Sequence, residues 1–162
     1  MHVAERLASL FTEKQLTVST AESCTGGGLS AQLTDIPGAS AFFLGGIIAY
    51  HNEIKEALLD VSHDTLTMHG AVSAPTAEAM ALGCRRRFRT DFAVSITGIA
   101  GPGGATPAKP VGLVFIAVAT PEGATAHVHH FQGDRDAVRA AAIESAIALL
   151  VAAAGGVTHS PS

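Results

Sequence analysis

The chain of 162 residues is poor in aromatic and charged side chains. It has no tryptophan, one tyrosine and seven phenylalanines, and charged residues make up 15% of it. Alanine and glycine are used heavily instead. Small side chains in that number favour helices and sheets that pack closely, rather than a core built on bulky aromatics. A chain of this length is long enough to bury such a core within one domain.

Positive charge and cysteine are also scarce. Ten lysines and arginines face fourteen acidic residues, and the resulting net charge of −4 argues against a nucleic-acid partner. The one basic cluster, residues 85–89, falls at the end of an expected helix, where cations interact favourably with the helix dipole. We therefore interpret it as a solvated helix end. Two cysteines, Cys24 and Cys84, do not make a disulfide framework.

Long uninterrupted apolar runs are nearly absent. The first eleven residues carry Glu5 and Arg6 inside their apolar pattern, which is unlike a signal peptide. The alanine-rich C-terminal stretch contains Arg139 and Glu144, so we expect a buried helix there rather than a membrane span. The sequence predicts a cytoplasmic protein with no membrane partner.

Apolar periodicity predicts alternating helices and strands, followed by a hairpin. This order predicts an α/β sandwich with a mixed, mainly parallel sheet. We expect one domain over residues 1–154 and a flexible tail over 155–162. The expected helices are 3–14, 26–34, 52–59, 64–69, 74–86 and 135–154, and the expected strands are 17–21, 42–50, 92–97, 113–120 and 125–131.

The most informative segment is TAESCTGGG, residues 20–28, which places Ser23 on a turn between a strand and a helix. Backbone N–H groups at a helix start are unpaired and carry the positive end of the helix dipole. A hydroxyl there lies beside a site for an anion or a developing oxyanion. The alternative is that Ser23 or Thr25 merely caps the helix. The segment alone leaves both interpretations open.

Three polar residues, Ser23, Tyr50 and Thr97, each lie at or just past the end of an expected strand. Ligands of open α/β sheets bind outside the carboxyl ends of the strands, so parallel strands would bring these residues to one crevice. A long Gly/Pro loop, residues 98–112, starts at the same edge, and such loops are usually functional or mobile. The candidate substrate ligands in these segments are Thr25, Gly26, Gly27, Thr97, Gly98 and Gly101.

The pairing most suggestive of catalysis is Ser23 with Lys55. A serine hydroxyl is a poor nucleophile until a neighbouring base takes its proton. Lysine can be that base if burial lowers its pKa from about 10.4 towards roughly 7–8. Tyr50 would relay the proton or hold the lysine. Spacing alone also allows a solvated Lys55 and a Tyr50 that is only a sheet-edge aromatic. Cys24 is less suited, because a neighbour of Ser23 points elsewhere on the turn.

Arg135 lies in the first turn of the last expected helix, between Asp134 and Asp136. An arginine beside a glycine-rich site suits bidentate phosphate binding, while a surface ion pair is the simpler explanation. The loop at residues 98–104 lacks the Lys-Ser/Thr of a P-loop, so nucleoside triphosphate hydrolysis is unsupported.

The eight histidines are poorly placed for a metal. His127 and His129 share one face of an expected strand, but no carboxylate or cysteine accompanies them. We expect structural or surface roles for them, with no metal site and no cofactor.

Taken together, the segments resemble the CinA C-terminal domain family, which includes stand-alone nicotinamide-nucleotide amidases. The resemblance implies a three-layer α/β/α sandwich and deamidation of nicotinamide mononucleotide to nicotinic acid mononucleotide and ammonia. It implies Ser23 as nucleophile, Tyr50 and Lys55 as activating residues, and Arg135 as a phosphate ligand. It also implies a homodimer or larger homo-oligomer. The matching pieces, in family order, are TAESCTGGG, DIPGASAFFLGGIIAYHNEIK, HGAVSAPTAEAMA, SITGIAGPGG, KPVGLVFIAVAT and FQGDRDAVR.

The sequence departs from the family pattern at His51, where a small hydroxyl residue is expected. Many relatives also carry an N-terminal nucleotide-processing domain, and the pyrophosphatase activity of those fused relatives cannot be carried over to the present sequence. In the implied mechanism, backbone N–H groups near residues 25–27 stabilise the oxyanion, while Arg135 and the loop at residues 98–104 hold phosphate and ribose.

Two other function classes compete with an amidase. A non-catalytic nucleotide-binding or regulatory module, linked to competence or DNA damage, would keep the glycine loops and Arg135 without needing Lys55 and Tyr50 beside Ser23. A phosphoester hydrolase should show carboxylate-rich metal ligation, which the sequence does not offer.

Overall fold

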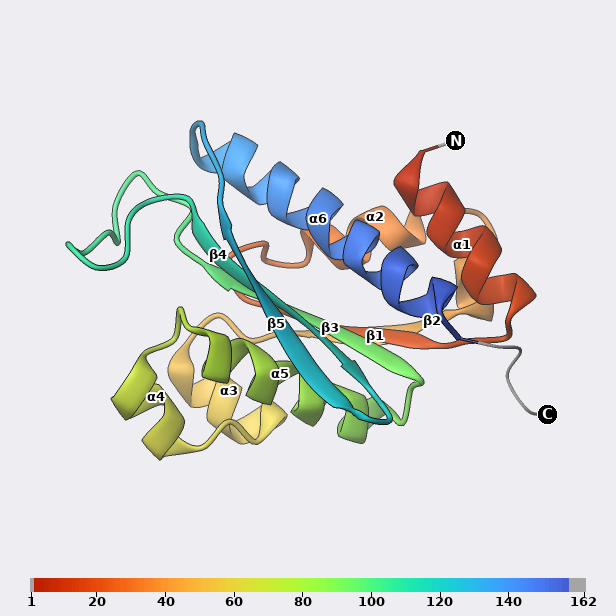
Figure 1. Ribbon diagram of the computed structural model, residues 1–162, viewed down its shortest axis with the longest axis horizontal. Coiled ribbons are helices and arrows are strands. Elements are labelled where there is room, and N and C mark those ends of the chain that lie inside the picture. The colour runs from red at the N-terminus through yellow and green to blue at the C-terminus, as the bar shows by residue number, and fades with distance from the viewer. Residues whose placement is uncertain (1, 158–162) are drawn as a thin grey trace.

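The computed structural model describes residues 2–157 and arranges them in three layers, with a sheet between two layers of helices (Figure 1). The predicted three-layer α/β/α sandwich is confirmed. The five strands are β1 (Val18–Glu22), β2 (Phe43–Ile48), β3 (Phe92–Gly98), β4 (Leu113–Thr120) and β5 (Gly123–His130). One helical layer holds α1 (Val3–Glu13), α2 (Gly28–Thr34) and α6 (Arg135–Gly155), and the other holds α3 (Asn52–Leu59), α4 (His63–His69) and α5 (Ala74–Phe88).

The strand order is β2-β1-β3-β4-β5. Strand β1 pairs in parallel with both β2 and β3, while β4 runs antiparallel to β3 and β5. The sheet is therefore mixed, as expected. Because β1 lies between two parallel neighbours, the chain leaving it at Ser23 lies between the carboxyl ends of β2 and β3. This arrangement brings three segments distant in sequence to one edge.

Small residues let the layers approach closely. On the α5 side the core contains Ala21, Ala93, Ala117 and other alanines of the sheet. Within that layer, a Cβ on Gly83 of α5 would lie 1.7 Å from the Leu59 carbonyl oxygen at the end of α3. Only glycine permits this approach, and α3 is thereby held against α5. This contact also positions Lys55, a predicted site residue that α3 carries.

Most element boundaries differ from those expected by one or two residues, and two of these differences have a clear local reason. Helix α2 begins at Gly28 rather than at residue 26, because Gly26 and Gly27 have φ angles of +57° and +101° and cannot belong to a right-handed helix. Strand β5 begins at Gly123 rather than at residue 125, because Thr120 and Gly123 already pair across a two-residue turn.

Helix α6 is long and apolar enough, by length and composition, to cross a membrane. It packs against α1 and against strands β3 and β4, as the expected core helix does. Its fully buried side chains are Val138, Ala142, Ala146, Ile147, Leu150 and Ala154. The expected tail is still helical at Gly155, and its residues 158–162 lie outside the described part of the chain.

Candidate active site

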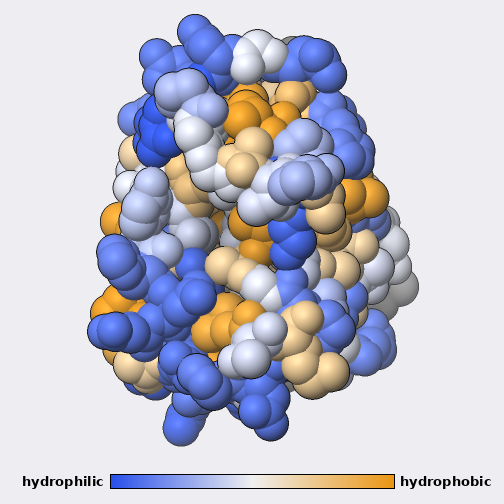
Figure 2. Space-filling model, turned by 90° about the vertical axis from the view of Figure 1, so that its left-hand side faces the viewer, coloured by the Kyte–Doolittle hydropathy of each residue, from blue (hydrophilic) through white to orange (hydrophobic). Residues whose placement is uncertain are grey.

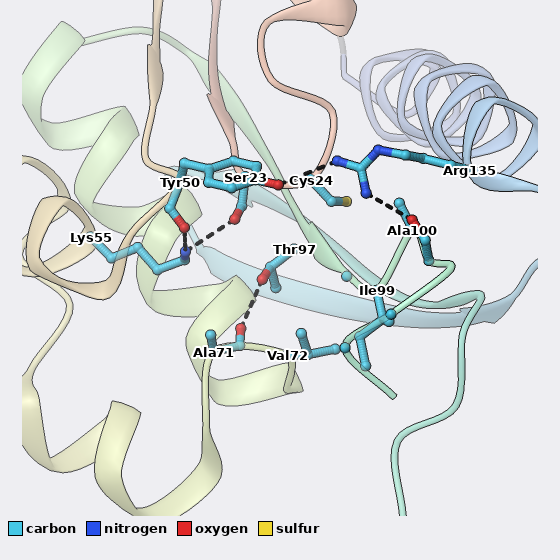
Figure 3. A pocket seen from close by; sticks show the side chains of 14 residues that line it. Ser23, Cys24, Tyr50, Lys55, Ala71, Val72, Thr97, Ile99, Ala100 and Arg135 are labelled. Atoms are coloured by element: carbon cyan, nitrogen blue, oxygen red, sulfur yellow. Dashed lines mark hydrogen bonds between the residues drawn. The ribbon is translucent and has the colours of Figure 1, made fainter. Parts of the chain in front are cut away.

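A cavity of about 260 Å³ opens beyond the carboxyl ends of β1 and β3 (Figure 3). Figure 2 faces the side of the molecule where the loop after β3 projects, and shows polar side chains around smaller apolar areas. The structure brings together seven predicted site residues in the cavity: Ser23, Tyr50, Lys55, Thr97, Gly98, Gly101 and Arg135. Cys24 and the Ala71–Val72 segment also line it.

Lys55 and Ser23 are in direct contact. Lys55 belongs to α3, is only 1% exposed, and directs its Nζ at Ser23 Oγ at 3.0 Å. The same ammonium donates to the carbonyl oxygens of Ala49, at 2.9 Å, and Tyr50, at 3.1 Å. The predicted pair is thus assembled through space, with the lysine held by the backbone at the end of β2.

Burial lowers the pKa of Lys55 from 10.5 to about 8. The three acceptors around Nζ suit both protonation states. A charged ammonium donates one proton to each of them, whereas a neutral amine still donates to the two carbonyls and offers its lone pair to the Ser23 hydroxyl. Lys55 therefore has the position and the basicity of a general base for Ser23.

Tyr50 holds the lysine through its main chain and not through its phenol. The Tyr50 side chain is 55% exposed, and its hydroxyl accepts a hydrogen bond from Arg135 Nη2 at 3.3 Å. Among the described residues the Tyr50 hydroxyl hydrogen-bonds to Arg135 and to neither Lys55 nor Ser23. Of the two roles expected for Tyr50, relaying the proton or holding the lysine, the structure shows the second, made by the Tyr50 carbonyl, while Ser23 and Lys55 are in direct contact.

Arg135 joins two walls of the cavity. Its Nη1 donates to the Gly101 carbonyl oxygen at 2.8 Å, while Nη2 reaches Tyr50. Neither side-chain ion pair found among residues 2–157 includes Arg135, so the simpler surface-pair explanation does not apply. These two bonds use only part of a guanidinium's five N–H donors, and the exposed cation faces the space next to Ser23.

The structure does not place Thr25, Gly26 and Gly27 in the cavity. The buried Thr25 hydroxyl donates to Glu22 Oε1 at 2.6 Å, and the Gly26 N–H donates to the Ser23 carbonyl at 3.1 Å. Gly27 faces Ile48 of β2. These three residues, expected as substrate ligands, instead form the turn on which Ser23 is mounted and lie outside the cavity lining.

Glu22, the last residue of β1, is a site residue that the sequence analysis missed. Its fully buried carboxylate accepts hydrogen bonds from the N–H groups of Leu29 and Ser30 and from the hydroxyls of Thr25 and Ser30. A carboxylate is stabilised at a helix N-terminus, so Glu22 occupies the place that the sequence suggested for a bound anion. A glutamate just before a helix-opening turn was the available signal.

Thr97 also has a structural task. It is 1% exposed, and its hydroxyl donates to the Ala71 carbonyl at 2.8 Å, which fixes the Ala71–Val72 wall of the cavity. At Gly98 a Cβ would come within 2.9 Å of the Leu113 carbonyl oxygen, so β3 and β4 remain close where the cavity loop begins.

Cys24 is not an activated nucleophile. Burial raises the pKa of its thiol to about 11, so the thiolate that would react is scarce near neutral pH. Within residues 2–157, no group of three or more histidine, cysteine or acidic side chains is placed to hold a metal ion.

The class defined by this fold and site is a three-layer α/β/α domain with a serine–lysine pair at the edge of its sheet. The family model of the CinA C-terminal domain matches residues 1–154, and the chain belongs to that family. The CinA-like protein of Crocosphaera subtropica is 55% identical over 129 residues, which are 80% of this chain and 31% of that protein. The CinA-like protein of Synechococcus sp. is 66% identical over 100 residues, 62% of this chain and 24% of that protein.

The chain thus spans about a third or less of the curated relatives it matches. Solved structures are similar over nearly their whole length. The competence/damage inducible protein CihA of Agrobacterium tumefaciens is 44% identical with a TM-score of 0.90, covering 93% of this chain and 92% of that one. The competence damage-inducible protein A of Klebsiella pneumoniae is 30% identical with a TM-score of 0.93, covering 96% and 97%.

Proposed function

We propose that this domain is an amidohydrolase that converts nicotinamide mononucleotide to nicotinic acid mononucleotide and ammonia, with Ser23 as nucleophile. The observation that carries the proposal is the buried contact of 3.0 Å between Lys55 Nζ and Ser23 Oγ. A lysine whose pKa is lowered to about 8 is neutral often enough near neutral pH to act as the base. Membership in the CinA family supports the same assignment.

In the proposed mechanism, neutral Lys55 takes the proton of Ser23 Oγ while the oxygen attacks the carboxamide carbon. The proton on Lys55 then passes to the amide nitrogen, the C–N bond breaks and ammonia leaves an ester on Ser23. Lys55, neutral again, removes a proton from water, which attacks the ester. Breakdown of the second tetrahedral intermediate returns the proton to Ser23 and releases the carboxylate product.

Substrate recognition is assigned to the outer part of the cavity. The exposed Arg135 guanidinium suits a phosphate, which it would bind with charge-assisted hydrogen bonds. A cavity of about 260 Å³ is at the small end for ligand sites, so the pyridine carboxamide would enter it while ribose and phosphate lie along Gly101 and Arg135. We infer that the protein acts on this small molecule in the cytoplasm.

The test is to incubate pure protein with nicotinamide mononucleotide and measure ammonia. We expect turnover by wild type and a loss of at least about 10³-fold in Ser23→Ala. Ser9→Ala, on the exposed face of α1, is the matched control and should retain full activity. No ammonia from wild type, or full activity in Ser23→Ala, contradicts the proposal. Binding of the nucleotide without turnover would support the non-catalytic module instead.

A further inference from the structure

Arg139 lies one helical turn after Arg135 on α6, yet it does not line the cavity. Its Nε donates to the Cys24 carbonyl oxygen at 3.1 Å, and its Nη2 donates to the Thr25 carbonyl oxygen at 3.1 Å. A single guanidinium therefore holds the two residues that follow Ser23. The same face of α6 thus supplies one arginine to the cavity and one to the turn beneath it.

These two bonds fix the orientation of the turn. A trans peptide is planar, and its N–H points opposite to its carbonyl. Since Arg139 draws the Thr25 carbonyl towards α6, the N–H of the same peptide, on Gly26, must point away from α6. That N–H donates to the Ser23 carbonyl at 3.1 Å. The turn that presents Ser23 is thus closed by the peptide that Arg139 orients.

The Cys24 carbonyl gives the same result for the peptide before it. The Thr25 N–H belongs to the same peptide as the Cys24 carbonyl, so it points opposite to the bond that Arg139 makes with that carbonyl. Thr25 is fully buried, and its N–H has no acceptor among residues 2–157. Buried N–H groups without a partner are rare in folded proteins. Because Thr25 is fully buried and does not line the cavity, this N–H belongs to the interior of the turn on which Ser23 is mounted.

Glu22 and Arg139 hold the turn from two sides. Glu22 accepts from the Thr25 hydroxyl and from the N–H groups at the start of α2, while Arg139 donates to carbonyls of the turn. A planar guanidinium fork can hold two carbonyls at fixed angles, which a lysine ammonium on its flexible stem does less rigidly.

We propose that Arg139 is a positioning residue for the nucleophile: it holds the Cys24 and Thr25 carbonyls so that the turn keeps Ser23 Oγ in contact with Lys55 Nζ. The proposal rests on the nucleophilic role of Ser23 but not on the identity of the amide substrate. Arg139 acts on the rate of attack by Ser23 and leaves the binding of substrate to Arg135.

The test measures labelling of Ser23 by a fluorophosphonate. In that reaction the bond from Oγ to phosphorus forms, the bond from phosphorus to fluorine breaks, fluoride leaves and the serine proton goes to Lys55. We expect labelling to slow about tenfold to a hundredfold in Arg139→Gln and to a lesser extent in Arg139→Lys. Arg6→Gln, on the exposed face of α1, is the matched control and should label at the wild-type rate. The pH midpoint of labelling should stay unchanged in all variants.

With nicotinamide mononucleotide as substrate, kcat should fall in Arg139→Gln while KM stays within about twofold of wild type. A purely structural role would lower the melting temperature without slowing the labelling of folded protein. Folded Arg139→Gln that labels at the wild-type rate overturns the proposal. If Arg139→Gln does not fold, the labelling rate of Arg139→Lys is the test instead. Labelling of Arg139→Lys at the wild-type rate would then overturn the proposal. Labelling that depends on Arg139 in a protein without deamidase activity refutes the proposed function and leaves Arg139 in its role.

Discussion

In the proposed mechanism the chemistry depends on Lys55, and the structure shows what lowers its pKa. Its Nζ is enclosed by two carbonyls and a hydroxyl, and desolvation makes the charged form costly, which brings the pKa from 10.5 to about 8. No carboxylate contacts the amine to restore the charged form among the described residues.

The lowered pKa of Lys55 predicts the pH dependence of the reaction. Only the neutral amine accepts the proton of Ser23, so kcat/KM should rise about tenfold per unit below pH 8 and level off above it. Because the folded pKa lies below the unfolded one, the unfolded chain binds more protons between them, and this group makes stability increase from about pH 8 to 10.5. A rate profile that is flat between about pH 6 and 9 would contradict the assignment.

A second prediction concerns Glu22. Glutamine in its place keeps one acceptor oxygen but turns an NH₂ group towards the N–H donors of α2, so we expect Glu22→Gln to lower the free energy of unfolding by about 2–4 kcal/mol. Urea unfolding measures it, with Glu13→Gln at the exposed end of α1 as control. If the free energy of unfolding fell equally in Glu22→Gln and Glu13→Gln, or stayed unchanged in both, the buried carboxylate would have no special role.

Among the elements, α3 carries Lys55, the proposed base, but the N-terminus of this helix has no side-chain cap. Its N-cap residue is His51, whose side chain makes no capping hydrogen bond, whereas the N-caps Ser62 of α4 and Ser73 of α5 both do. The departure from the family pattern at residue 51 thus falls on a helix cap, where a small hydroxyl residue would satisfy a free N–H.

His51→Ser should therefore raise the free energy of unfolding by about 1 kcal/mol, because serine can accept from an N–H of the first turn. Urea unfolding measures this change, as a shift of the midpoint with an m-value equal to that of wild type. Ser62→Ala, which removes an existing cap from α4, provides the comparison with opposite sign. Lower stability in His51→Ser would show that the histidine contributes in another way.

The elements were more predictable from the sequence than the contacts between them. Periodicity and turn residues located every strand and every α-helix of the described residues, though not the short 3-10 helix Ala39–Ala41, and α3 and β4 match their predicted bounds. The tasks of Tyr50 and Thr25 could not be predicted, because they depend on which way a backbone carbonyl or a hydroxyl turns after tertiary packing. Arg139 was noted only as a charge in an apolar helix, since its partners lie more than a hundred residues away.

For the whole molecule, one of the two edges of the sheet is relevant to assembly. Strand β2 lies at that edge, and Leu44 and Ile48 on it are 50% and 55% exposed. A homo-oligomer, implied by the family resemblance, would remove such a surface from water.

We therefore expect a mass of at least twice the 16.4 kDa monomer in sedimentation at micromolar concentration. Ile48→Lys should shift the protein towards the monomer if β2 lies in the interface. A wild-type protein that sediments as a 16.4 kDa species at every concentration would refute the expected assembly.

The central claim is that Ser23 attacks an amide and carries the acyl group. The most direct measurement is mass spectrometry of the protein quenched during turnover of nicotinamide mononucleotide, followed by peptide mapping. We predict a covalent adduct on Ser23 whose mass equals that of the substrate less ammonia, and no adduct in Ser23→Ala. An adduct on Cys24, or continued release of ammonia by Ser23→Ala, would contradict the claim.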